Sequence, residues 1–247
     1  PLGMGIAHDS ENVYWYNDGY YGELVRYDFQ DDHDTGEDDH SDGKVRRYSD
    51  ISLTRTPGVP GHMEMNHDNG ILYIADTGAG RVIWVNTDGP GVTTNIMGDD
   101  TQMEPLAEYS EVTGVEWGIL DSGLYFPSGI ALHQGVLFVS QNGNGKITGY
   151  ILDDDGKGLT YSRTVSTNAG SIMGLEVGPN GKLWYVDSQN NQVIRMDPYE
   201  DTDFDEVRDS LDVYPNNSLL WSDSDGDGYA DQSGTEISDD CLLYTSD

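Results

Sequence analysis

The strongest constraint on the fold of this chain is a series of short apolar segments separated by turns, clearest between Pro60 and Asp88. Alternating apolar side chains predict three short β-strands there, at His62–Asn66, Ile71–Asp76 and Arg81–Asn86. The Asn, Asp and Gly residues between them supply the positive φ angles that tight hairpins need. Because one such meander cannot bury its own apolar faces, the chain must contain further copies of it.

Three more copies of this meander are present, at Gly5–Asp28, Pro127–Asp153 and Met173–Asp197. The copies align on an aromatic residue of their second strand, with spacings of 59, 65 and 46 residues by subtraction of the residue numbers Tyr14, Tyr73, Phe138 and Trp184. A propeller blade needs roughly 40–50 residues, so the first two intervals each hold one blade and an insertion. The sequence therefore predicts an all-β propeller of four recognisable blades, either complete or part of a six-bladed parent.

The four blades are expected within residues 4–213, the first at Met4–Leu53, the third at Ser128–Val165 and the fourth at Gly174–Val213. A long link joins the second blade to the third. In it, Val92–Met97 is predicted to be the outermost strand of the second blade, and Met103–Tyr109 a short helical turn. Open edges on the first and last blades would need each other or a second chain, which predicts self-association.

The motifs at Gly61–Val85 and Pro127–Tyr150 resemble the signature of NHL-repeat propellers and of the wider gluconolactonase-like and paraoxonase-like six-bladed propellers. That signature reads P-x-G-I-A, then G-x-L-Y-V-A-D-T, then N-x-R-I. The resemblance covers roughly residues 3–200 and implies the propeller fold. It does not specify a function, because NHL propellers include enzymes, receptors and scaffolds.

The net charge of −33, from 45 acidic and 12 basic residues, limits the partners of the chain. A surface of this sign repels nucleic-acid phosphates and anionic lipid, so neither is an expected partner. Most of the acids are interpreted as a halophilic or marine solvation shell, with cation binding as the alternative. No apolar segment approaches the ~18 residues that a membrane span needs.

Both ends of the chain are interpreted as partly non-native. Pro1-Leu2-Gly3 resembles the remnant of a cleaved tag, so Met4 is the expected natural start, and any export signal would have been removed with the original N-terminus. Residues 241–247 fit no repeat and are interpreted as a non-native or truncated tail. The single cysteine, Cys241, excludes an internal disulfide framework.

An acidic segment near the C-terminus carries the strongest local signal. Its expected metal ligands are Asp223, Asp225, Asp227, Tyr229 and Asp231. Alternate Asp residues on a tight loop deliver the roughly six to eight oxygens that Ca²⁺ requires, with the Tyr229 carbonyl at the seventh position. The segment resembles a thrombospondin type-3 repeat more than an EF-hand, which would need Glu where this chain has Gly234. Residues 214–240 are therefore predicted to form an acidic calcium-binding tail, and such repeats imply an exported protein.

His62 is the leading candidate for a residue of the propeller channel, because it opens an inner strand. Its place before L-Y-I-A-D resembles the zinc-ligand histidines of peptidyl-hydroxyglycine lyase, a six-bladed NHL-type enzyme. The equivalent positions in the other copies are Gly3, Ser128 and Met173, so the remaining ligands of that lyase are not reproduced. His62 is thus a candidate ligand for Zn²⁺ or another divalent transition metal, with a hydrogen-bonded channel residue as the alternative.

Other histidines are weaker metal candidates. His8 and His67 are interpreted as equivalent residues at the far end of their inner strands, and His133 matches them with a one-residue offset. Together they form a second candidate metal ring. The acidic hairpin tip at residues 31–43 also carries His33 and His40, and is interpreted as solvated, with divalent-metal chelation as the alternative.

Glu64 and Glu176 are the best candidates for a buried channel carboxylate, one step into their strands. In the gluconolactonase-like enzymes that the chain resembles, a Glu and several Asn or Asp side chains hold a central Ca²⁺ that activates the substrate. Asn17, Asn142 and Asp187 follow second strands and match the Asn/Asp part by role alone.

Two functions are consistent with these candidates. In the first, the chain is an exported metal-dependent hydrolase or lyase, of lactonase, esterase or phosphotriesterase type, acting on a small molecule at the channel mouth. His62 and Glu64 would then be ligand or base, assisted by tyrosines such as Tyr16, Tyr20 and Tyr21. In the second, it is a non-catalytic, Ca²⁺-stabilised binding module of a larger protein, which the incomplete ligand set favours. Divalent cations are expected partners in both, and the expected location is secreted or on the surface of a bacterium.

Overall fold

The structure is a computed structural model, and it describes residues 2–31, 36, 39–96, 105–179, 181–196, 202, 207, 211–226 and 228–231. The chain divides into two compact units, Pro1–Met196 and Asp197–Asp247. Every helix or strand assigned among the described residues is a β-strand, and all of them lie in the first unit. The predicted all-β fold is therefore confirmed. No helix in the described ranges has the length and apolar character that crossing a membrane requires.

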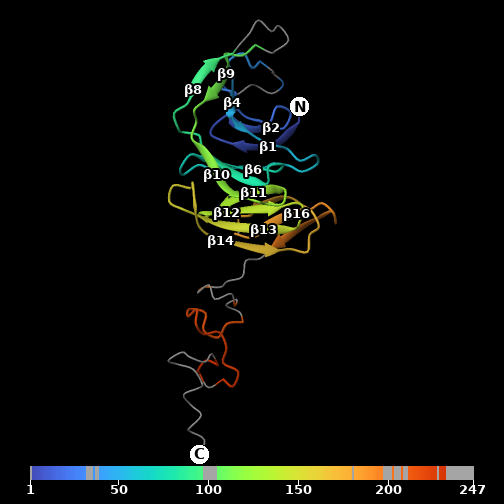
Figure 1. Ribbon diagram of the computed structural model, residues 1–247, viewed down its shortest axis with the longest axis vertical. Helices are drawn as coiled ribbons and strands as arrows, with labels where there is room; N and C mark the ends of the chain where they lie inside the picture. Colours follow the sequence, from blue (N-terminus) through green and yellow to red (C-terminus); the bar gives the residue numbers. More distant parts are fainter. Residues whose placement is uncertain are drawn as a thin grey trace, which may run out of the picture. The chain divides into compact units, whose positions relative to one another are not determined.

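Four sheets form the first unit, and each begins with a meander at a predicted repeat (Figure 1). The first sheet starts with β1 (Gly3–His8), β2 (Val13–Asp18), β3 (Glu23–Asp28) and β4 (Lys44–Ser52). The second contains β5 (Met63–Asn66), β6 (Ile71–Asp76), β7 (Arg81–Asn86) and β10 (Trp117–Ser122). The third contains β11 (Pro127–His133), β12 (Val136–Gln141), β13 (Lys146–Leu152) and β14 (Leu159–Ser166), and the fourth β15 (Ile172–Val177), β16 (Leu183–Asp187) and β17 (Gln192–Met196).

The first strands of the four sheets are the inner strands, and they lie in chain order beside one another: β1 contacts β5, β5 contacts β11, and β11 contacts β15. Backbone hydrogen bonds join their starts, since the Gly61 N–H donates to the Met4 carbonyl at 2.9 Å and the His62 N–H to the Ser128 carbonyl at 3.0 Å. The glycine of the G-I-A motif permits this approach. A β-carbon on Gly5 would lie 2.3 Å from the Gly61 carbonyl oxygen.

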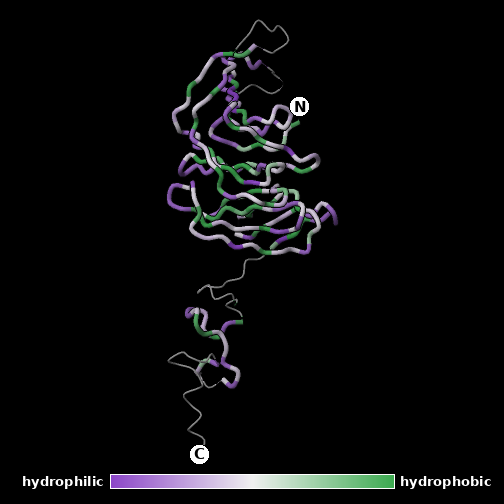
Figure 2. Tube along the Cα trace, viewed as in Figure 1, coloured by the Kyte–Doolittle hydropathy of each residue, from purple (hydrophilic) through white to green (hydrophobic). Residues whose placement is uncertain are grey.

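Three apolar cores lie between successive sheets and hold the stack together. Strands β6 and β7 are buried on both faces: Leu72 and Ile74 face the first sheet, and Tyr73 packs with Leu137 of the third. The third core joins Ile147 and its neighbours to the fourth sheet. Figure 2 shows hydrophobic residues on the strands of the stacked sheets and hydrophilic ones in many of the connecting turns. Each meander thus buries an apolar face against a neighbouring sheet, which is the propeller arrangement.

The structure corrects the alignment of the first repeat. Trp15, and not Tyr14, is equivalent to Tyr73. Each of the two lies three residues before the aspartate that ends its strand, which is Asp18 in β2 and Asp76 in β6. Each is also buried in the core that its sheet shares with the next sheet. Trp15 is only 1% exposed. Side chains alternate between the faces of a strand, so the one-residue slip placed Tyr14 on the wrong face.

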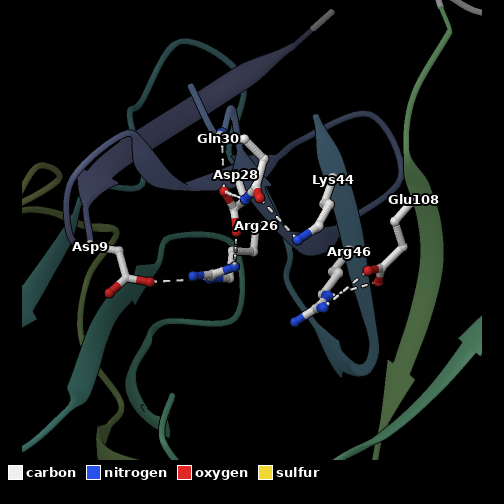
Figure 3. Close-up of polar contacts among 7 residues, drawn as sticks. All are labelled: Asp9, Arg26, Asp28, Gln30, Lys44, Arg46 and Glu108. Carbon is white, nitrogen blue, oxygen red and sulfur yellow. Dashed lines mark hydrogen bonds and ion pairs between the residues drawn. The ribbon is translucent and has the colours of Figure 1, made fainter. Parts of the chain in front are cut away.

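The long link after the second sheet also differs from the prediction. Strands β8 (Val92–Asn95) and β9 (Glu108–Thr113) belong to the first sheet and not to the second. The order of the first sheet is β1-β2-β3-β4-β9-β8, and β9 runs parallel to β4. Arg46 of β4 donates to both carboxylate oxygens of Glu108, at 2.8 and 3.0 Å (Figure 3). The outermost strand of the second blade is therefore β10, and the end of the predicted helical turn, Glu108 and Tyr109, is β-strand.

Candidate functional site

A pocket of about 630 Å³ lies where the inner strands of all four sheets meet. We call it the channel pocket and define it by six of its lining residues, which are Tyr16, His62, Glu64, Ile130, Leu175 and Glu176. Its volume is in the range of small-molecule binding sites. Because the four inner strands come from every repeat, the stacking of the blades is what assembles this pocket.

Two carboxyl groups face this pocket from different blades. Glu64, on β5, is half-buried, whereas Glu176, on β15, is exposed and accepts a hydrogen bond from the Val177 N–H at 3.0 Å. Burial, and then the nearby Glu176 carboxylate, raise the pKa of Glu64 to about 7. A carboxyl group with this pKa can both donate and accept a proton at neutral pH, as general acid–base catalysis requires.

His62 immediately precedes β5 and is held by its backbone, since its N–H donates to the Ser128 carbonyl and its carbonyl accepts from the Ala75 N–H at 2.9 Å. Its ring is half-buried, and burial lowers the pKa of His62, so the neutral imidazole prevails at neutral pH. The ring lies against Gly174 of the fourth sheet. A neutral imidazole supplies one hydrogen-bond donor and one acceptor to a ligand in the pocket.

Of the three tyrosines considered for catalysis, only Tyr16 reaches the pocket. Burial, and then the charge of Asp18, raise the pKa of Tyr16, so its hydroxyl group keeps its proton. Tyr20 and Tyr21 lie on the turn after β2 and are 68% and 65% exposed. The Arg47 guanidinium lies over the Tyr21 ring, 4.8 Å from its centroid.

The channel pocket does not supply the donors of a three-histidine zinc site. Over the described residues, no group of three or more His, Cys, Asp or Glu side chains is placed to hold a metal ion. The positions predicted to match His62 carry no imidazole, and the Ser128 hydroxyl is already used, because it donates to the Ile172 carbonyl at 2.7 Å. We therefore assign no chemical step in this pocket to a metal ion.

The second predicted histidine ring forms only in part. The rings of His8 and His67 lie 6.0 Å apart, and His8 Nε2 bonds to the Glu11 carbonyl at 3.0 Å. His133 ends β11, where its Nε2 atom is 3.8 Å from the position that a β-carbon on Gly181 would take. The structure thus brings two of these histidines together without a third metal-binding side chain in the described ranges.

The residues matched by role to a central Ca²⁺ site make other hydrogen bonds. Asn17 lies within β2 and Asp187 ends β16, so of the three only Asn142 follows its second strand. The Asn17 amide donates to the Gly61 carbonyl at 3.2 Å, and the Asn142 amide to the Ile172 carbonyl at 3.1 Å, so both tie one blade to the inner strand of the next. Asp187 accepts from Asn190 in its own turn. This hydrogen bonding accounts for the side chains that were matched to a central Ca²⁺ site by role.

A smaller cavity of about 320 Å³ lies at the outer part of the first sheet, with Tyr27, Phe29, His40 and Arg47 among its lining residues. The Arg47 guanidinium is engaged there by Tyr109, Glu23 and Asp18. His33, the other histidine of the acidic hairpin tip, lies outside the described residues. The cavity lacks the paired carboxyl groups of the channel pocket, so we place the candidate chemistry in the channel pocket.

The predicted calcium loop is closed by its own carboxylates. The Asp223 carboxylate accepts from the Gly226 N–H at 2.8 Å and the Gly228 N–H at 2.9 Å. The Asp231 carboxylate accepts from the Ser224 hydroxyl at 2.7 Å, and the hydrogen bonds from Ser224 lower the pKa of Asp231. Asp227 lies outside the described residues, as do residues 232–247. The carboxylates of Asp223 and Asp231 are therefore both hydrogen-bonded within the loop that they begin and end.

Sequence comparison finds neither a matching family model nor a matching curated protein. Solved structures are similar in fold. A catalytically inactive virginiamycin B lyase from Staphylococcus aureus with quinupristin matches at 16% identity and a TM-score of 0.50, covering 78% of this chain and 52% of that one. A streptogramin B lyase matches at 14% sequence identity with a TM-score of 0.49, and the match covers 78% of this chain and 51% of that one. A nidogen/laminin complex matches at 15% identity with a TM-score of 0.43, and the match covers 79% of this chain and 76% of that one. The chain spans about half the length of the two lyases, and the similarity concerns the propeller fold alone.

Proposed function

We propose that the first unit is a small-molecule hydrolase and that its channel pocket cleaves esters or lactones by general acid–base catalysis. The observation that carries this proposal is the half-buried Glu64 carboxyl group, with a pKa of about 7, in a pocket of small-molecule size. A group that exchanges protons at neutral pH in a concave site is the expected mark of an acid–base centre.

In the proposed reaction, ionised Glu64 removes a proton from a water molecule while the water oxygen forms a bond to the carbonyl carbon. The carbonyl π electrons move to its oxygen, which accepts a hydrogen bond from neutral His62. When the carbonyl re-forms, the bond to the leaving oxygen breaks, and Glu64 returns the proton to that oxygen. One water is thereby added across the ester bond. In a lyase reaction the same carboxylate would remove a proton next to the carbonyl group and transfer it to the leaving group.

The test is hydrolysis of a panel of esters and lactones by the full chain and by Glu64→Gln. We expect Glu64→Gln to lose about 10²–10⁴-fold in kcat/KM, the usual contribution of a positioned acid–base group. Asp154→Asn is the matched control, because it removes one negative charge from the exposed turn before β14, and it should keep full activity. Equal activity of Glu64→Gln and the wild type would end the proposal.

A Ca²⁺-stabilised binding module is the second candidate function, and it rests on the spacing of the acidic residues between Asp223 and Asp231. We propose that this loop binds Ca²⁺ through Asp223, Asp225, Asp227, Asp231 and the Tyr229 carbonyl, where the ion would order the loop. Binding at the millimolar Ca²⁺ of extracellular fluid would fit an exported or surface-attached protein. A divalent transition metal at His62 stays a prediction.

We also propose that the chain self-associates through the fourth sheet. The face of the fourth sheet turned away from the third exposes Trp184, Val186 and Val193, at 37%, 40% and 67%. The equivalent aromatic residue of the second sheet, Tyr73, is completely buried by the next blade. An apolar face of this kind supports the predicted contact with further chain, either a second copy or additional blades.

A further inference from the structure

We infer that the ligand of the channel pocket carries a positive charge. This inference deepens the proposed function, on which it rests for the identity of the site. Among the described residues that line the pocket there are two carboxyl groups, Glu64 and Glu176, and neither a lysine nor an arginine. The described walls of the pocket provide no compensating cation, and a positively charged ligand would supply one.

None of the lysines and arginines described in the propeller is among the residues that line the channel pocket, and several of them pair with acids, as Figure 3 shows for Arg26 and Arg46. Arg26 of β3 bonds to Asp9 at 3.1 Å and to Asp28 at 3.2 Å, and Arg46 of β4 bonds to Glu108. These strands are the third and fourth of their sheet, away from the inner strand. The same pairing occurs in other sheets and turns, in Arg81 with Asp76 and Lys157 with Glu116. Their charges are thus largely neutralised where they stand.

His62 does not supply the missing positive charge. Its ring is half-buried and lies against Gly174, and burial favours the neutral imidazole. The net charge of −33 adds a long-range negative potential over the whole chain. Concave sites with walls of low dielectric concentrate such a field and raise the local concentration of ions of opposite sign. Local and overall charge therefore both select cations.

The remaining walls suit the apolar part of an organic cation. The lining includes the aromatic residue Tyr16 and the exposed apolar residue Ile6. Ammonium groups bind favourably over aromatic faces, and quaternary ammonium ions do so with little cost of desolvation. The ligand class that fits is a small organic amine or quaternary ammonium compound, which for the proposed reaction would be an ester or lactone bearing that group.

The test measures binding of choline and of its neutral isostere, 3,3-dimethylbutanol, to the full chain by calorimetry. We expect one site that prefers choline by about tenfold or more. Glu176→Gln should reduce choline affinity several-fold and leave the weak binding of the alcohol unchanged. Asp154→Asn removes the same charge from an exposed turn and should leave choline affinity as in the wild type. Equal affinities for the two probes, or equal effects of the two substitutions, would overturn the inference.

Choline has no ester bond, so its binding does not depend on turnover, and failure of the inference can be told from failure of the proposed function. A choline site in a chain that hydrolyses no ester would support the cation pocket and remove the hydrolase. Hydrolysis of neutral esters without any preference for cationic ones would support the hydrolase and overturn the cation pocket.

Discussion

The Cε1 atom of His62 lies 2.9 Å from the position that a β-carbon on Gly174 would occupy. The imidazole of the second sheet therefore rests on a glycine of the fourth, and any larger residue there must displace it. Gly174→Ala should lower activity, or ligand affinity, by about tenfold, because small misplacements of a catalytic group are costly. Thermal stability should change by less than about 2 °C, since the displaced group is the end of a side chain.

Gly149→Ala is the control for this substitution. Gly149 lies in β13, and its added β-carbon would find its nearest neighbour, in the Phe138 ring, at an ordinary 3.5 Å. Activity and melting temperature should both stay near those of the wild type. If Gly174→Ala also kept full activity, the placement of His62 against Gly174 would not matter for function.

The stability of the chain should depend on pH through Glu64. Its pKa is raised from 4.5 to about 7 in the folded chain, so the folded state binds this proton more tightly than the unfolded state. The stability that this tighter proton binding provides is fully present below the pKa of Glu64 in the unfolded chain, 4.5, and is lost as the pH rises through its pKa in the folded chain, about 7. Glu64→Gln cannot ionise, so at pH 8 it should be more stable than the wild type by about 1 kcal/mol, a value reduced for partial solvent access.

Urea unfolding at pH 8 and pH 4 checks this prediction. The advantage of Glu64→Gln should be present at the higher pH and largely disappear at the lower one, where the wild-type carboxyl group is mostly protonated in both states. An advantage of the same size at both pH values would show that the substitution acts through packing and that the carboxyl group titrates normally.

Two tryptophans at equivalent positions should differ in their importance for stability. Trp15 is 1% exposed between the first and second sheets, whereas Trp184 is 37% exposed on the free face of the fourth. Trp15→Ala should cost about 3–5 kcal/mol of unfolding free energy. Trp184→Ala should cost about 1–2 kcal/mol, because less apolar area is removed from burial. Denaturant unfolding of both variants measures the difference, and equal losses would mean that Trp184 is covered in solution.

Calcium should act on the second unit alone. Raising Ca²⁺ to millimolar concentration should slow amide exchange in residues 211–231, and Asp223→Asn should abolish that protection by removing one of the proposed ligands. Asp154→Asn should respond to Ca²⁺ like the wild type. Unchanged exchange in this segment of the wild-type chain would remove the calcium assignment, with no bearing on the channel pocket.

The meander of the second blade could be predicted from sequence because its strands and turns are encoded locally. Apolar alternation and Asn/Asp/Gly turns placed β6 and β7 at their observed residues, and β5 within one residue. Pairing of β9 with β4 was not predictable in this way. It joins segments about 60 residues apart in parallel, and depends on contacts such as Arg46 with Glu108 that no local pattern announces.

The candidate site was predictable in its members and not in its chemistry. His62, Glu64 and Glu176 were selected because they open or enter inner strands, and all three line the channel pocket. The raised pKa of Glu64 needs the burial and the approach of Glu176 that only the stacked sheets provide. The contact of Gly174 with His62 was not predicted. The available signal was the glycine that recurs just before an apolar residue of the inner strand, as in Gly129-Ile130 and Gly174-Leu175.

The most direct test of the account is the titration of the Glu64 carboxyl carbon by NMR, in chain labelled at the glutamate side-chain carboxyl and assigned with Glu64→Gln. We expect a midpoint of about 7, and a lower one in Glu176→Gln, where the neighbouring charge is absent. A midpoint near the ordinary 4.5, unchanged by Glu176→Gln, would mean that this carboxyl group is fully ionised at neutral pH and would contradict the proposed acid–base centre.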